Sequence, residues 1–216
     1  MFHRRHKSIR SAAPSAPLVE LIKRTRILVI DDVETEFPFS ILKKQGYAID
    51  YWADVNDLPK LESGFYDIII LDIGGIGQEL DDVNEGVGVL RHIKQTNPSQ
   101  IVIAYSGEAH DTHRIPFFQL ADEYVPKPTN AISWKETLDH MIGSKCTVDH
   151  YWSTLEALLR NQGTSARNIA RIERALVKAC TGNTFDPCKF ISKNLGSIEN
   201  AATMLSIISK IGSLFS

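Results

Sequence analysis

The chain has 216 residues, of which 43% are hydrophobic and 23% are charged, and its formal net charge is −2. These values are ordinary for a soluble globular protein. No apolar run approaches the roughly 20 residues that span a bilayer, so we expect no membrane span. The basic start of the chain lacks the apolar stretch of a secretory signal, and the three cysteines show no CxxC spacing. We therefore expect reduced thiols and a cytoplasmic protein.

Residues 1–24 are basic and then rich in Ser, Ala and Pro, which predicts a flexible tail with room for one helical turn near its end. Charge is uneven beyond it, because 20 of the 26 acidic residues lie within residues 27–143. An acidic centre between basic flanks fits a cation-binding middle module, whose flanks contact it, contact an anionic partner or are simply solvated.

From residue 25 onward, strand and helix patterns alternate, as is typical of βαβ units with a parallel sheet. Strands are predicted at 26–31, 48–52, 67–72, 100–105 and 122–126. Helices are predicted at 34–45, 56–63, 86–96, 110–120 and 131–142. The third strand is an unbroken apolar run, which indicates a central strand covered on both faces.

After residue 143 the strand pattern stops, and residues 144–216 are predicted to form a small all-α region. Its helices are expected at 149–161, 165–180, 187–194 and 197–214, with glycines between them as stop signals. The last helix carries an apolar stripe that must be buried against something.

Four of the predicted strands end in polar side chains suited to phosphoryl chemistry. They are Asp31 and Asp32, Asp72, Ser106 and Lys127. The carboxyl ends of parallel strands share one edge of the sheet, where ligands bind. Carboxylates there suit Mg²⁺ or attack on a phosphoryl donor, and the lysine and hydroxyl suit phosphoryl oxygens. Taken singly, each aspartate could also be only a turn former or a helix cap.

Residues of about 25–142 resemble the receiver domain of two-component response regulators. The matching pieces are Ile27–Asp32, Asp67–Asp72, Ala104–Gly107 and Tyr124–Pro128. The resemblance implies a doubly wound, flavodoxin-like sheet of five parallel strands in the order 2-1-3-4-5, with a receiver domain at 25–143.

The resemblance also implies a role for each matching residue. Asp72 would accept a phosphoryl group from a histidine kinase or phosphotransfer protein, in a phosphorelay. Mg²⁺ would be held by Asp31, Asp32, Asp72 and the backbone carbonyl of Gly74. Ser106 and Lys127 would bind the phosphoryl group, Tyr124 would act as an aromatic switch, and Glu108 would tune dephosphorylation. Such a protein is a regulator whose chemistry is limited to its own phosphorylation and dephosphorylation, not an enzyme.

Two features depart from the family pattern. The segment after Asp72 is about six residues longer than usual, lacks the usual proline and carries acidic residues over 76–85. It could slow access to the site or tune metal affinity, or be a harmless surface insertion. Pro116 falls inside the fourth predicted helix and should distort it, which places dimerisation by the common family mode in doubt.

The output of residues 144–216 is not explicit. Four basic residues share one face of the helix at 165–180, namely Arg167, Arg171, Arg174 and Lys178. This anion-binding face could contact DNA, dock on the acidic receiver or remain in water. The favoured interpretation is a helical module for self-association, as a homodimer, or for binding a protein partner.

Two other functions are open. The chain could be a DNA-binding transcription regulator that uses the basic helix at 165–180. It could also be a metal-dependent phosphatase or phosphotransferase for a small substrate, which would need a second catalytic acid and a substrate pocket that the sequence does not reveal.

Overall fold

The structure is a computed structural model that describes residues 8–81, 83–107, 119–182, 185–195 and 201–215. Its contacts divide the chain into two compact units. One unit is Pro17–Gly143, here called the sheet unit. The other combines Met1–Ala16 with Ser144–Ser216 and is called the helical unit.

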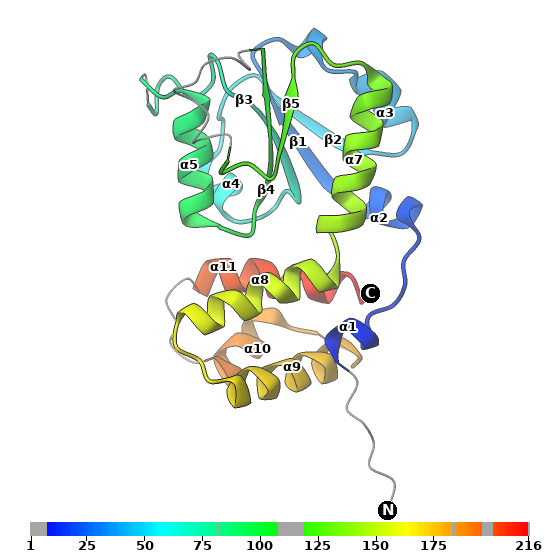
Figure 1. The fold of residues 1–216 in the computed structure, drawn as a ribbon, viewed down its shortest axis with the longest axis vertical. Coiled ribbons are helices and arrows are strands. Elements are labelled where there is room, and N and C mark those ends of the chain that lie inside the picture. The colour runs from blue at the N-terminus through cyan, green and yellow to red at the C-terminus, as the bar shows by residue number, and fades with distance from the viewer. Residues whose placement is uncertain (1–7, 82, 108–118, 183–184, 196–200, 216) are drawn as a thin grey trace, which may run out of the picture. The chain divides into compact units, whose positions relative to one another are not determined.

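The sheet unit is built on five parallel strands in the order β2-β1-β3-β4-β5, which confirms the predicted fold class (Figure 1). The strands are β1 (Arg26–Ile30), β2 (Ala48–Trp52), β3 (Ile68–Asp72), β4 (Ile101–Ser106) and β5 (Glu123–Pro126). Its helices are α2 (Leu18–Arg24), the 3₁₀ turn η1 (Glu34–Glu36), α3 (Phe39–Lys44), α4 (Leu58–Glu62), α5 (Gly86–Thr96) and α7 (Ala131–Lys145). Every residue of β3 and β4 is buried, as the apolar run in β3 predicts.

Helices cover both faces of this sheet, with α4 and α5 on one side and α3 and α7 on the other (Figure 1). On the α5 side, strand residues such as Leu28, Ile69 and Val102 pack against Leu90 and Ile93 of α5. On the α7 side, Trp134 is fully buried against Phe37 and Tyr105, with ring centroids 4.9 and 5.0 Å away. The predicted fourth helix, at 110–120, and Pro116 within it lie almost wholly outside the described residues.

The helical unit contains α1 (Ile9–Ala12), α8 (Val148–Asn161), α9 (Ala166–Cys180), α10 (Pro187–Asn194) and α11 (Ala201–Ser213). The C-terminal region is therefore helical, as predicted. Side-chain caps start four of its helices: Ser8 accepts from the Ser11 amide, Thr147 from His150, Ser165 from Asn168 and Asp186 from Lys189. One core joins α1, α8, α9, α10 and α11.

The segment predicted as a flexible tail, 1–24, contains the helical turn expected near its end and, in addition, a helix that was not predicted. Residues 9–12 and 18–24 are helical. Ile9 is fully buried in the core of the helical unit, and its amide donates to Glu173 Oε1 at 3.0 Å. Arg10 also pairs with Asp149. Ile9 is one apolar residue in a segment of basic and small residues, and its partners in the core lie about 140 residues or more further along the chain.

Candidate phosphoryl and metal site

The strand register brings the predicted polar residues to one edge of the sheet. Ile30 pairs with Leu71, so Asp31 and Asp72 are level at the ends of β1 and β3. Further along the sheet, Ser106 at the end of β4 pairs with Pro126, so Lys127 follows directly at the end of β5. The Lys127 amide donates to the Ser106 carbonyl at 2.9 Å.

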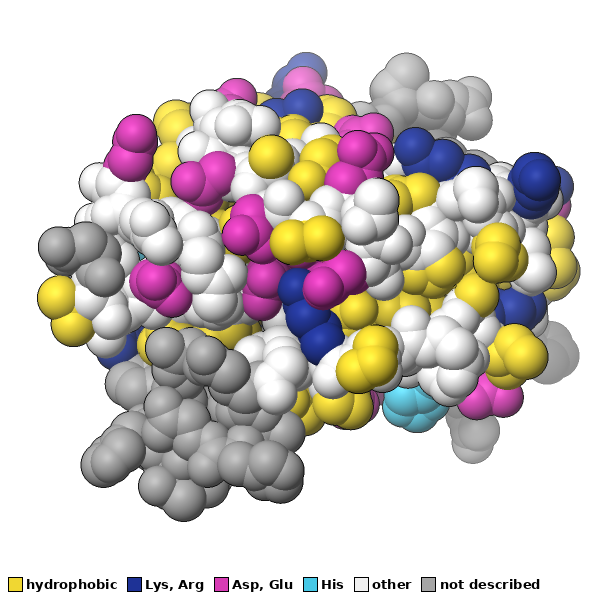
Figure 2. All heavy atoms as spheres, turned by 90° about the horizontal axis from the view of Figure 1, so that it is seen from above, with side chains coloured by type: hydrophobic (Ala, Val, Ile, Leu, Met, Phe, Trp, Pro, Cys, Tyr) yellow, Lys and Arg dark blue, Asp and Glu magenta, His cyan; other side chains and the backbone are white. Residues whose placement is uncertain are grey.

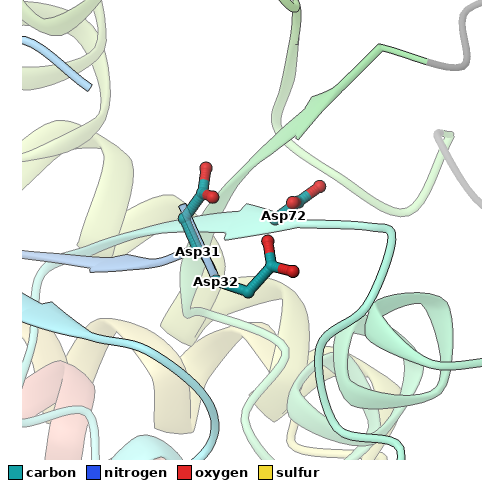
Figure 3. A group of neighbouring side chains, drawn as sticks. All are labelled: Asp31, Asp32 and Asp72. Carbon is teal, nitrogen blue, oxygen red and sulfur yellow. The ribbon is translucent and has the colours of Figure 1, made fainter. Parts of the chain in front are cut away.

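Three carboxylates form the centre of this edge. Asp31, Asp32 and Asp72 each offer an oxygen, and these oxygens lie within 4.8 Å of one another. Figure 3 shows the three side chains projecting from the ends of β1 and β3. Figure 2, which looks onto this edge, shows Asp and Glu side chains gathered there. An all-oxygen set at this spacing fits a hard divalent cation such as Mg²⁺, because neighbouring carboxylates repel one another without a cation.

Backbone and side-chain hydrogen bonds orient the aspartates. Asp31 Oδ1 accepts from the Val33 amide at 2.9 Å, and Tyr51 Oη donates to the Asp31 carbonyl at 2.7 Å. Asp72 Oδ1 accepts from the Gly74 amide at 3.1 Å. Oδ2 of Asp72 faces the lysine instead. Hydrogen bonds from the backbone therefore orient the carboxylates of Asp31 and Asp72.

Lys127 reaches back into the acidic cluster. Its Nζ lies 2.8 Å from Asp31 Oδ2, 2.9 Å from Asp72 Oδ2 and 3.0 Å from Glu36 Oε2. Burial by itself lowers the pKa of Lys127, but the bonds to the three carboxylates outweigh it, so the pKa lies above its ordinary value. The lysine is thus a fixed cation at the site. Glu36 was not among the residues predicted from the sequence.

Asp72 has the properties of a partly desolvated carboxylate. Burial raises its pKa above the ordinary value, while hydrogen bonds from Lys127 and the Gly74 amide oppose that rise. Its side chain is 9% exposed, against 1% for Asp31. Asp32 is exposed. Of the two level aspartates, Asp72 is the more accessible to an incoming group.

Ser106 and Tyr124 lie beside the lysine. Ser106 is 2% exposed. Tyr124 is half-buried, and its Oη donates to the Ser106 carbonyl at 3.0 Å, so the ring is attached to the end of β4. Burial raises the pKa of Tyr124. Glu108, predicted to tune dephosphorylation, lies outside the described residues.

The longer segment after β3 is folded onto the sheet unit. Ile76 is fully buried, the Gly77 amide donates to Asp54 Oδ1 at 2.7 Å, and Glu85 Oε2 accepts from the Gly75 amide at 3.1 Å. This segment is therefore anchored at several points, unlike a loose surface insertion. Its effect on access or metal affinity stays a prediction.

Gly86 opens α5 against the backbone that follows β3. A Cβ at this position would lie 2.2 Å from the Asp72 carbonyl oxygen and 2.9 Å from Ile73 Cα. The glycine therefore permits a close approach of helix and strand directly beneath Asp72.

The predicted anion-binding face lies on α9 in the helical unit. Arg167, Arg171, Arg174 and Lys178 are all exposed, and Arg174 Nε donates to the Ala170 carbonyl at 3.1 Å. They belong to a different unit from the residues at the sheet edge, and what they bind stays a prediction.

Solved structures similar to this chain include receiver domains of response regulators. A CheY-like receiver from Methanospirillum hungatei JF-1 is 25% identical, with a TM-score of 0.46, and the match covers 56% of this chain and 95% of that one. TrrA from Thermotoga maritima, solved with Mg²⁺ and BeF, is 31% identical, with a TM-score of 0.44 and coverage of 54% and 98%. A two-component response regulator from Clostridium difficile is 21% identical, with a TM-score of 0.47 and coverage of 56% and 97%.

No protein-family model matches the chain, and no curated protein matches it. Across the described residues, every helix is too short or too polar to cross a bilayer.

Proposed function

We propose that the chain is a response regulator that accepts a phosphoryl group on Asp72, with Mg²⁺ as cofactor, from a histidine kinase or phosphotransfer protein. The observation that carries this proposal is the convergence of Asp31, Asp32 and Asp72 with Lys127 at one sheet edge. Aspartates that only form turns would not need a partly buried lysine whose ammonium contacts two of them.

The reaction needs one nucleophile and one leaving group. An ionised oxygen of Asp72 forms the new bond to phosphorus, and the bond from phosphorus to the donor nitrogen or oxygen breaks. The electron pair of that bond leaves with the donor, which is a histidine imidazole or, for acetyl phosphate, acetate. A bound Mg²⁺ would supply positive charge to the phosphoryl oxygens.

The residues of the chain would orient and stabilise the product. Lys127 is within 2.9 Å of Asp72 Oδ2 and would pair with a phosphoryl oxygen attached there. Asp72 pairs with Tyr105, so Ser106 is the next residue along β4. Its hydroxyl would donate a hydrogen bond to a phosphoryl oxygen. Movement of the end of β4 would also move the Tyr124 side chain, because Tyr124 Oη donates a hydrogen bond to the Ser106 carbonyl.

The phosphorylated sheet unit would then control the helical unit, which we propose binds a second copy of the chain or a protein partner in the cytoplasm. DNA binding through the basic face of α9 is less favoured, because four exposed cations without a recognisable reading helix supply only non-specific attraction to phosphates.

The test is incubation of the full chain with Mg²⁺ and acetyl phosphate, followed by intact-mass measurement. Wild type should gain the mass of one phosphoryl group, and chelation of Mg²⁺ or Asp72→Asn should abolish the gain. Glu136→Gln, which removes an exposed carboxylate from α7, should behave as wild type. No mass gain in wild type would contradict the proposal, and turnover of a small phosphoester beyond one equivalent would favour a phosphatase instead.

A further inference from the structure

Lys127 is shared by three carboxylates, and one of them is outside the set that the receiver resemblance predicts. Asp31 and Asp72 hold the ammonium at 2.8 and 2.9 Å, and Glu36 of η1 holds it at 3.0 Å. The same ammonium must contact the phosphoryl group if Asp72 is the acceptor. Glu36 therefore already occupies part of the coordination that the phosphoryl oxygens would need.

The three carboxylates differ in how easily they can release the lysine. The Asp31 and Asp72 side chains are 1% and 9% exposed, whereas the Glu36 side chain is 46% exposed. Water can therefore replace the lysine more readily at Glu36 than at the two aspartates. When a new anion binds to Lys127, the ion pair between Lys127 and Glu36 is therefore the one that breaks at the lowest free-energy cost.

Hydrogen bonds hold the backbone of Glu36, while its side chain is about half exposed. The Glu36 amide donates to the Val33 carbonyl at 3.1 Å, and Tyr105 Oη donates to the Glu36 carbonyl at 3.5 Å. The next residue, Phe37, is buried against Trp134. A carboxylate on an anchored turn can leave Lys127 by rotation of its side chain alone, without unfolding the turn.

The negative charge of the site makes Glu36 and a phosphoryl group compete more strongly for Lys127. Asp31, Asp72 and Glu36 place three carboxylates around one ammonium, and Asp32 adds a fourth carboxylate to the cluster. A phosphoryl group adds a further charge of about −1.5 to −2. An acyl phosphate donor is also an anion, and the Glu36 side chain, 46% exposed, adds negative charge that faces water at this site. Glu36 would oppose both the approach of the donor and the binding of the product.

We propose that Glu36 is an internal competitor for Lys127: its carboxylate holds the lysine in the unphosphorylated state and must release it when Asp72 is modified. The inference rests on the proposed function of Asp72. Glu36 is a positioning residue in this account, because it acts through Lys127. It sets a barrier against adventitious phosphorylation that a bound kinase could overcome by displacing the carboxylate.

The test is the rate of phosphorylation by acetyl phosphate of full-length Glu36→Gln at saturating Mg²⁺ and limiting donor. Removing the charge should raise the rate about two- to fivefold, as expected for a partly exposed ion pair. The Mg²⁺-dependent midpoint for beryllofluoride, read by tryptophan fluorescence, should fall by a similar factor. Both gains should shrink in high salt, which screens an exposed charge. A purely structural effect of the substitution would not follow salt in this way.

Glu34→Gln is the matched control. Glu34 lies in the same turn and is exposed, and it has no described ion pair with Lys127, so its substitution removes the same charge but no contact with the lysine. It should change the rate much less than Glu36→Gln. An unchanged or slower rate in Glu36→Gln, or equal gains in the two variants, would overturn the inference. If wild type itself is not phosphorylated, the proposed function fails first, so the two failures are distinct.

Discussion

Replacement of Lys127 by Met should show how strongly the site depends on the lysine ammonium. The side chain is 14% exposed and faces Asp31 and Asp72 at 2.8 and 2.9 Å. Removing one partner of a buried ion pair typically costs about 3–5 kcal/mol. The sheet edge is open to water on the Glu36 side, and Asp72 can take up a proton, so we expect a loss of about 2–3 kcal/mol.

The assay is urea unfolding in the presence of a chelator, with amide hydrogen exchange of β1 and β3 to read the sheet unit separately. Mg²⁺ should return most of the lost stability, because a ligand at 100 times its dissociation constant adds about 2.7 kcal/mol. The defect should also shrink on acidification. Loss of Lys127 removes a group that lowers the pKa of Asp72, so the pKa rises further, and a protonated Asp72 carries no uncompensated charge.

Lys44→Met is the control, because Lys44 is exposed on α3 and has no described ion pair. It should lie within about 0.5 kcal/mol of wild type. If Lys127→Met in chelator is as stable as Lys44→Met, or if Mg²⁺ stabilises neither protein, the acidic cluster does not need a cation and the reasoning is refuted.

Three further predictions concern the strand end, the helical core and pH. Gly86→Ala should cost about 1–3 kcal/mol in chemical unfolding, because its Cβ would meet the Asp72 backbone, whereas Gly143→Ala should be neutral or stabilising, since its nearest contact is 3.8 Å away. Ile9→Ala should cost about 2–4 kcal/mol, measured by hydrogen exchange in α8 and α9; no loss there would contradict the docking of α1. Burial raises the pKa of Asp72 above its unfolded value, so its ionised form disfavours folding, and Asp72→Asn should raise the free energy of unfolding at neutral pH in chelator. This gain should vanish below the ordinary pKa of an aspartate, and a gain that grows on acidification would contradict it.

The sheet edge was predictable because two regular rules act together. Apolar runs indicate strands, and parallel strands align their carboxyl ends, so residues that follow the runs must meet. The start of α5 at Gly86 also follows, since the expected helix at 86–96 coincides with Gly86–Thr96. The order and direction of the strands follow from the pattern of apolar runs, which can be read directly from the sequence.

Glu36 and Ile9 were not predictable in the same way. Glu36 lies in a short 3₁₀ turn, where no periodic sequence pattern marks a carboxylate as part of a site. Its proposed role depends on the ion pair with Lys127, which lies 91 residues later in the chain. Ile9 is one apolar residue in a basic segment, and its partners in α8 and α9 follow about 140 residues or more further on. Both depend on tertiary contacts rather than on local propensity.

The central claim is that Asp72 itself receives the phosphoryl group. Reduction of the acetyl phosphate-treated protein with borohydride converts an aspartyl phosphate to homoserine, which peptide sequencing by mass spectrometry can locate. The account predicts a single Mg²⁺-dependent homoserine at position 72. Modification at Asp31 or Asp32 instead, or at no carboxylate, would contradict it.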